Sequence, residues 1–244
     1  MRENRELACE LKFLIPVDVA AGVREWARNK LLPDPHGNGN AGDEYRITSL
    51  YFETEAFDVY NRKGSFARSK YRIRRYGLEE VVYLERKLKT NGLVAKRRSP
   101  AETPEIKRLS KTEPDEDWTG SWYHKRVLLR QLKPICQISY ERTARVASTP
   151  SGPVRLTLDE NLRAVPAKEY QFQADGQCIR VSPESVVMEL KYRGETPGIF
   201  KELIEQFGLS PKKMSKYRLG AVALGLVPEN VIEFPAQRNS VCLP

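Results

Sequence analysis

The sequence has few of the residues that hold transition metals or build disulfide frameworks. Its 244 residues include two histidines, and its four cysteines lie far apart with no C-x-x-C pair. This pattern argues against a zinc site and against a disulfide scaffold, and it favours free thiols in a reducing compartment. One histidine, His124, lies beside Lys125 and Arg126 in a stretch with helical spacing, and we expect it to be a solvated surface residue.

Long apolar runs and nucleotide-binding motifs are also missing. No window approaches the roughly 18 consecutive apolar residues of a membrane span, and no apolar signal segment follows residues 1–6. We therefore expect a cytoplasmic protein; a membrane partner and the oligomeric state stay open. Residues 37–42 fit G-x-G-x-x-G, but a helical pattern and two prolines precede them and a strand pattern follows. A dinucleotide site needs the opposite order, so a loop is expected there.

Positive charge is what the sequence has in excess. The chain carries 41 Lys and Arg against 32 Asp and Glu, a net charge of +9, with 40% hydrophobic residues. The apolar content is sufficient for a core, and the charge implies an anionic partner: nucleic acid, a membrane surface or a phosphorylated small molecule. We expect one domain over residues 1–228 and a C-terminal tail over residues 229–244.

The stretch 70–76, Lys-Tyr-Arg-Ile-Arg-Arg-Tyr, carries this charge with the period of a β-strand. Lys70, Arg72 and Arg74 are expected on one face, with Tyr71 and Ile73 on the other. Three neighbouring cations repel one another, so this strand needs an anion. Water and salt, carboxylates of neighbouring strands, or a bound phosphate chain could supply it.

Seven or eight predicted strands share this pattern, with ionised residues two apart on one face and apolar residues on the other. The further pairs are Glu10/Lys12, Glu85/Lys87, Lys96/Arg98, Tyr140/Arg142, Arg155/Asp159 and Glu189/Lys191. A half-solvated antiparallel sheet would explain any one of them. However, amphipathic helices are expected at 18–32, 121–132, 196–207 and 210–224, and their apolar sides must be covered. We therefore predict an α+β fold: an antiparallel eight-stranded β-barrel with helices packed outside, leaving room inside for one small ligand.

The charges on the predicted inner face do not balance. About ten cations stand against four or five carboxylates, and an unpaired ion taken out of water costs several kcal/mol. Such a face must be wet, and it is suited to a polyanion. The carboxylates are then expected to hold a divalent metal, because Mg²⁺ and Mn²⁺ prefer oxygen ligands and often bind one or two carboxylates together with substrate phosphate.

Seven short motifs occur in a familiar order along the chain. They are Glu10-Leu11-Lys12-Phe13, Lys70-Tyr71-Arg72-Ile73-Arg74, Glu85-Arg86-Lys87, Ser139-Tyr140-Glu141-Arg142, Arg155-Leu156-Thr157-Leu158-Asp159, Glu189-Leu190-Lys191-Tyr192 and Ser215-Lys216-Tyr217. With them, residues 7–225 resemble the VTC domain, the polyphosphate polymerase branch of the triphosphate tunnel metalloenzymes. The opening Glu10-x-Lys12, in place of E-x-E-x-K, favours this branch over the CYTH branch.

The resemblance implies an antiparallel tunnel that binds ATP, triphosphate or polyphosphate with Mn²⁺ or Mg²⁺. It implies catalytic roles for four cations and phosphate contacts for eight further residues. The first set is Arg72, Arg74, Arg142 and Lys191; the second is Lys12, Lys70, Lys87, Lys96, Arg155, Lys213, Ser215 and Lys216. The last three would close on the phosphate chain from the final helix.

Carboxylates have two possible roles under this resemblance. Glu189 would be a metal ligand. Glu10 could be a second ligand, but an ion pair with a lysine is an equally good expectation. Asp159 is expected to be a salt-bridge partner of an arginine or lysine on the same face.

Three functions are compatible with these patterns. The leading hypothesis is transfer of the terminal phosphoryl group of ATP to a growing polyphosphate chain. A metal-dependent tripolyphosphatase or nucleoside triphosphatase of the same fold is the second, and a polyphosphate or nucleic-acid binding module without activity is the third. Nucleic acid is not expected as a partner, because Tyr71 lies opposite the cations of its strand, a position that favours core packing over base stacking.

Overall fold

The computed structural model describes residues 9–37, 41–90 and 93–227, which form an α+β fold built on one antiparallel sheet. The strands are β1 (Cys9–Pro16), β2 (Leu32–Pro33), β3 (Glu44–Glu53), β4 (Ser69–Tyr76), β5 (Val81–Thr90), β6 (Leu93–Glu102), β7 (Lys133–Thr149), β8 (Gly152–Pro166), β9 (Ile179–Arg180) and β10 (Ser185–Tyr192). The helices are α1 (Val17–Lys30), α2 (Asp58–Asn61), α3 (Ser121–Leu129), α4 (Gly198–Gln206) and α5 (Lys216–Ala223). Short 3₁₀ helices span Gly64–Arg68, Thr103–Ser110 and Asp175–Gln177.

Eight strands follow one another through the sheet in the order β1-β10-β8-β7-β3-β4-β5-β6, and β2 and β9 pair beside this path with β7 and β8. This confirms the predicted antiparallel fold and its eight main strands. Among the described residues the path is open, with β1 and β6 as its ends, and the sheet is not closed. The predicted hairpin residues Asn91 and Gly92 lie outside the described residues, and β5 and β6 on either side of them pair antiparallel.

The described chain divides into two compact units, each assembled from separate segments. The first unit contains residues 46–140 and 163–180, and the second contains residues 9–45, 141–162 and 181–227. Strands β3, β7 and β8 each contribute residues to both units. The prediction of one domain over residues 1–228 stays a prediction, and the expected tail lies outside the described residues.

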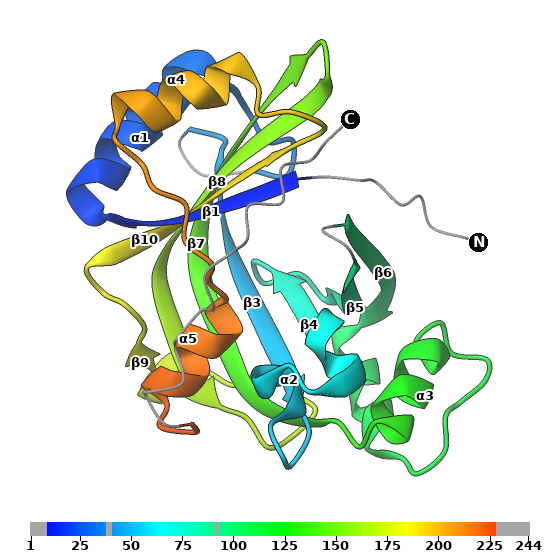
Figure 1. The fold of residues 1–244 in the computed structure, drawn as a ribbon. Helices are drawn as coiled ribbons and strands as arrows, with labels where there is room; N and C mark the ends of the chain where they lie inside the picture. Colours follow the sequence, from blue (N-terminus) through cyan, green and yellow to red (C-terminus); the bar gives the residue numbers. More distant parts are fainter. Residues whose placement is uncertain (1–8, 38–40, 91–92, 228–244) are drawn as a thin grey trace. The chain divides into compact units, whose positions relative to one another are not determined.

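The second unit has a continuous apolar core between its strands and two helices. Alternate residues of β1, β8 and β10 point into this core, among them Phe13, Leu156 and Met188. Helix α1 contributes Val23 and Trp26, and α4 lies next to α1 (Figure 1). Because these helices cover the apolar face, the ionised residues of the same strands are left on the opposite face. The predicted role of the amphipathic helices is confirmed here.

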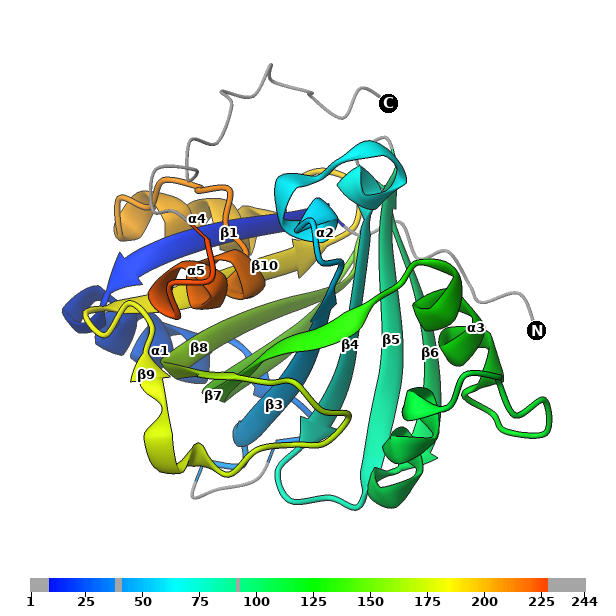
Figure 2. The same cartoon turned by 90° about the horizontal axis from the view of Figure 1, so that it is seen from below.

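The first unit packs α3 against its strands through aromatic side chains. The Tyr71 and Tyr123 rings lie 6.1 Å apart, and Phe52 meets Tyr123 edge-on at 5.8 Å. Helix α3 lies beside β5 and β6 (Figure 2). The core position of Tyr71 was predicted. The prediction that His124 lies at the surface is wrong. This residue is fully buried, and its Nε2 contacts the carbonyl oxygen of Lys111 at 3.0 Å.

The final helix starts later than its sequence pattern predicts. Helix α5 begins at Lys216, so Lys213 and Ser215 precede it and do not lie in it. The segment before α5 contacts β1 instead, where the backbone N–H of Lys212 donates to the carbonyl oxygen of Lys12 at 2.7 Å. Across the described parts of the chain, no helix combines the length and apolar character needed to cross a membrane.

Candidate functional site

A buried carboxylate gathers three cations on one face of the first unit. Glu85 of β5 accepts from Arg72 of β4 at 2.7 Å and pairs with Lys96 of β6 at 2.5 Å. Arg98 of β6 is 3.6 Å from the same carboxylate. Residues 72, 85 and 98 are direct cross-strand neighbours, so their side chains share a face. We call Arg72, Arg74, Glu85, Lys96 and Arg98 the Glu85 cluster.

The cations of this cluster keep Glu85 ionised. Burial by itself raises the pKa of this carboxyl, whose side chain is 2% exposed. The charges of Arg72 and Arg74, followed by that of Lys96, outweigh burial and hold the pKa of Glu85 well below its ordinary value. Glu85 therefore fixes the positions of the cations over the whole neutral range.

Arg74 is held by neutral groups. Its Nε donates to the Ser49 hydroxyl at 3.2 Å, and its Nη2 donates to the Tyr140 hydroxyl at 3.0 Å. The residue is 6% exposed. Hydroxyl partners orient a guanidinium group without cancelling its charge, so Arg74 adds a fixed positive charge to the cluster.

This face carries far more positive than negative charge. Lys70, Lys87 and Lys96 are direct cross-strand neighbours in one row, and like charges directly opposite one another are destabilising. Two further rows follow on the same face, one with Arg72, Glu85 and Arg98 and one with Arg74. Over these three rows, β4, β5 and β6 place one carboxylate, Glu85, among many cations. Those cations are Lys70, Arg72, Arg74, Lys87, Lys96 and Arg98. The arrangement is suited to an anion with several charges.

The second unit has a more evenly charged network on the face opposite its core. Glu189 of β10 accepts from Lys12 of β1 at 2.6 Å and from Lys216 of α5 at 3.1 Å. Lys216 also pairs with Asp159 of β8 at 2.5 Å. Arg142 of β7 donates to both oxygens of Asp159, at 2.6 and 2.8 Å. We call these five residues the Glu189 cluster. The prediction that Asp159 forms a salt bridge with an arginine or lysine is confirmed.

Burial and charge compete in the Glu189 cluster, and charge prevails. Burial raises the pKa of Glu189, but the charges of Lys12 and Lys216 outweigh it and hold the pKa well below its ordinary value. For Lys12 the signs are reversed: burial lowers the pKa, and the charges of Glu189 and Glu10 raise it above its usual value. These ion pairs are therefore fully charged at neutral pH.

Arg155 has a partner that the sequence did not suggest. Its Nη2 lies 2.9 Å from a carboxylate oxygen of Asp34 and donates to the Tyr45 hydroxyl at 2.6 Å. Asp34 is buried between two prolines in the segment after α1, where no periodic pattern indicates the direction of a side chain. Chain order alone therefore gave no signal for this contact.

Glu10 and Glu189 are the two carboxylates expected to bind a divalent metal. Lys12 Nζ lies 3.5 Å from Glu10 and 2.6 Å from Glu189, and Lys191 Nζ lies 3.8 and 3.9 Å from the same two carboxylates. Within the described ranges, no three His, Cys, Asp or Glu side chains form a metal-binding group. One or two carboxylates fit an Mg²⁺ or Mn²⁺ ion whose other ligands are phosphate and water.

Apart from Lys213 and Ser215, which precede α5, the predicted site residues fall into two groups. Lys70, Arg72, Arg74, Lys87 and Lys96 share the face of the Glu85 cluster. The remaining strand residues and Lys216 belong to the Glu189 network or to its neighbours: Glu10, Lys12, Arg142, Arg155, Glu189 and Lys191. Sequence reasoning missed Asp34, Tyr45 and Ser49 as partners and did not single out Glu85 as a common acceptor.

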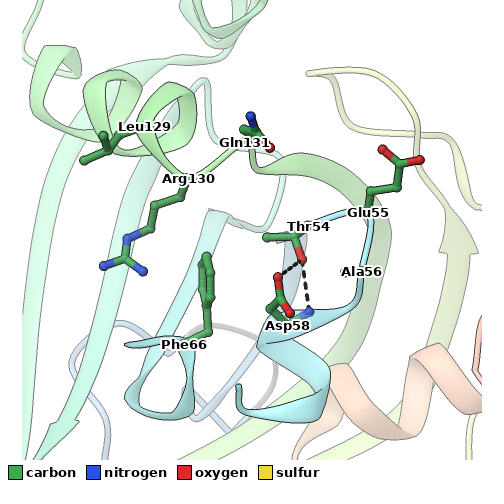
Figure 3. A pocket seen from close by; sticks show the side chains of 8 residues that line it. All are labelled: Thr54, Glu55, Ala56, Asp58, Phe66, Leu129, Arg130 and Gln131. Carbon is green, nitrogen blue, oxygen red and sulfur yellow. Dashed lines mark hydrogen bonds between the residues drawn. The ribbon is translucent and has the colours of Figure 1, made fainter. Parts of the chain in front are cut away.

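A separate cavity of about 440 Å³ opens in the first unit between the start of α2 and the end of α3 (Figure 3). The Thr54 hydroxyl donates to Asp58 at 2.8 Å, and the Arg130 guanidinium lies 4.8 Å from the centre of the Phe66 ring. None of the predicted site residues lines this cavity. Its lining is Thr54, Glu55, Ala56, Asp58, Phe66, Leu129, Arg130 and Gln131.

Comparison with known proteins shows relatives of this fold. Among solved structures, a proposed adenylate cyclase from Bacillus halodurans is 18% identical, with a TM-score of 0.54 over 86% of this chain and 94% of that one. A proposed adenylyl cyclase from Hippeastrum, described as having a dominant triphosphatase activity, is 15% identical, with a TM-score of 0.50 over 88% and 96%. These likenesses show a shared fold. No curated protein matches the chain.

The family comparison covers almost all of the described residues. The family model named VTC domain matches residues 8–224, which include every residue of the Glu85 and Glu189 clusters. The chain therefore belongs to the VTC domain family.

Proposed function

We propose that this protein is a metal-dependent phosphotransferase that moves the terminal phosphoryl group of ATP to the end of a polyphosphate chain. The observation that carries the proposal is the excess of positive charge in the Glu85 cluster and in the lysine row beside it. Cations oriented in advance by Glu85, Ser49 and Tyr140 are suited to phosphate oxygens, and membership of the VTC domain family supports the same substrate class.

Phosphoryl transfer asks little covalent chemistry of the protein, because most of the catalysis is alignment and neutralisation of charge. In the first unit, Arg72 and Arg74 would bind phosphate oxygens, with Lys70, Lys87 and Lys96 as further contacts. In the second unit, Arg142 and Lys191 would have the same role, with Lys12, Arg155 and Lys216 as supporting cations. Lys213 and Ser215, in the segment before α5, are proposed phosphate contacts as well.

Lys216 can exchange partners in this scheme. Its ammonium group binds Asp159 and Glu189, and a phosphate oxygen would replace either one. Glu189, with Glu10, would hold Mn²⁺ or Mg²⁺, and the metal would supply charge neutralisation at the phosphate oxygens. Release of Lys216 and Lys12 toward phosphate would leave Glu189 available for that role.

A hydrolase of the same fold is the second candidate. The Hippeastrum neighbour is described as having a dominant triphosphatase activity, so water is a reasonable acceptor in place of a phosphate chain. A nucleic-acid binder is less well supported, since Tyr71 is buried and its ring is unavailable to stack on a base.

One assay separates these functions. The pure protein is incubated with ATP and Mn²⁺, and the products are resolved by gel electrophoresis for chain length and assayed for free phosphate. We expect polyphosphate of growing length, and we expect Arg72→Ala to abolish it. Lys125→Ala, which removes an exposed surface cation of α3, is the matched control and should retain activity. Phosphate release without chain growth would favour the triphosphatase, and binding of triphosphate without either product would leave a binding module.

A further inference from the structure

A second set of cations lies on the opposite face of the same three strands. Tyr71 of β4, Arg86 of β5 and Arg97 of β6 are direct cross-strand neighbours in one row. Each is adjacent in sequence to a residue of the row that joins Arg72, Glu85 and Arg98, and neighbouring residues of a strand point to opposite faces. Arg86 and Arg97 therefore lie on the face that carries α3 and not on that of the Glu85 cluster.

Among the described residues, the two guanidinium groups have no carboxylate to neutralise them. Like charges directly opposite one another in a sheet repel. In the part of the chain that the structure describes, neither Arg86 nor Arg97 forms an ion pair with an acidic residue. The other face of these strands differs, because its cations Arg72, Lys96 and Arg98 share the carboxylate of Glu85. A pair of opposed arginines without a counter-ion is suited to an external anion.

Aromatic rings hold these arginines in position. The Arg97 guanidinium lies 4.1 Å from the centre of the Trp122 ring, and that of Arg86 lies 5.9 Å from the centre of the Tyr71 ring. The Trp122 indole N–H donates to the Ser99 hydroxyl at 2.7 Å, which fixes the ring. Such contacts orient a guanidinium while leaving its charge in place.

Arg86 also has a donor that lacks an acceptor. Its Nε is buried and makes no hydrogen bond within the described residues. A buried donor without a partner is costly, so an acceptor that reaches this group would stabilise the fold. Arg97 is exposed, which gives a ligand access to the pair from solvent.

We propose that Arg86 and Arg97 form an anion site for a ligand with two or more phosphate groups, on the α3 side of the first unit and separate from the Glu85 cluster. Guanidinium groups match phosphate oxygens in geometry and remain charged at all physiological pH values. The ring face of Trp122 toward Arg97 is already occupied, so recognition rests on phosphate and not on base stacking. This inference does not depend on the proposed phosphotransferase reaction.

Calorimetric titration with tripolyphosphate tests the proposal. We expect the wild type to bind at more than one site, and Arg97→Gln and the double variant Arg86→Gln/Arg97→Gln to lose one of them, with affinity there falling about tenfold or more. Arg108→Gln is the matched control. Arg108 also lies over a tryptophan, Trp118, but it pairs with Asp115 and Glu105, so its charge is already neutralised.

The outcomes separate this site from the proposed reaction. Loss of one class of tripolyphosphate sites in Arg97→Gln, with unchanged turnover of ATP, supports the second site. Identical isotherms for the wild type, Arg97→Gln and the double variant would overturn it.

Parallel titrations with inorganic phosphate, vesicles containing anionic phospholipid and a single-stranded oligonucleotide identify the source of the phosphate. Tighter binding of the oligonucleotide than of tripolyphosphate, lost in Arg97→Gln, would overturn the exclusion of base stacking. Arg97 is exposed, so this single variant remains informative if the double variant fails to fold.

Discussion

Glu85 shows how one carboxylate organises cations from three strands. Arg72, Lys96 and Arg98 approach it from β4 and β6, and its own side chain is nearly inaccessible to water. Without this anion the three cations would repel one another, and their side chains would extend into solvent. Glu85 thus has a positioning role that is independent of any contact with substrate.

This role predicts a particular pH dependence for Glu85→Gln. The folded-state pKa of Glu85 is lowered, so its contribution to stability is present above the unfolded pKa of about 4.3 and is lost as pH falls through the folded value. At pH 7 we expect the variant to be less stable by roughly 2 kcal/mol. The difference from the wild type should shrink as pH falls below about 4.

Urea unfolding at a series of pH values measures this difference. Glu116→Gln is the control, because Glu116 forms an exposed pair with Lys125 and should behave like the wild type. An equal stability of Glu85→Gln and wild type at pH 7 would contradict the positioning role.

Among the helices, α5 begins at a buried lysine that forms ion pairs, and Tyr217 and Ala221 of the same helix are buried as well. Its first residue, Lys216, connects the helix to Asp159 of β8 and Glu189 of β10, and the ammonium group is almost completely buried. Helices α1 and α4 are different, because apolar side chains attach them to the sheet. Ion pairs can be exchanged for contacts with a ligand, whereas an apolar interface opens only at a large cost. The first residue of α5 is therefore able to exchange its partners for phosphate, while the buried Tyr217 keeps the helix in place.

We predict that Lys216→Met destabilises the protein by roughly 1–3 kcal/mol, since it leaves two buried carboxylates with one cation fewer. Adding Glu189→Gln to this variant removes part of the uncompensated negative charge and should recover part of the loss. Thermal unfolding of the single and double variants at pH 7 measures both effects. A double variant whose losses simply add would show that the two residues do not interact.

For the molecule as a whole, the net charge of +9 favours association with polyanions. Long-range attraction of this kind is screened by salt, with a Debye length of about 8 Å at physiological ionic strength. Fixed hydrogen bonds to phosphate are screened less. The balance between the two determines how specific the binding is.

We therefore predict that the Kd for tripolyphosphate rises steeply between 50 and 500 mM KCl, by about tenfold or more. A neutral osmolyte at matched osmolality is the control and should leave the Kd unchanged. Salt-independent binding would mean that the excess charge of the chain contributes nothing to recognition.

The residue pattern along the chain was enough to predict the faces of the strands, the eight main strands, the helices that cover the apolar side in the second unit, and the family. It could do so because alternation and helical spacing are local properties of the chain. It also indicated Lys12, Glu189 and Lys216 as members of a site.

Which ionised side chains pair with one another depends on the tertiary fold. The Lys12–Glu189 contact joins residues 177 positions apart, and Arg155 meets Asp34 from a segment without periodicity. The buried His124 and the segment before α5 likewise have partners outside their own elements, the carbonyl oxygens of Lys111 and Lys12. Strand register and helix docking set these pairings, and both depend on packing between segments far apart in the chain, which a local pattern does not encode.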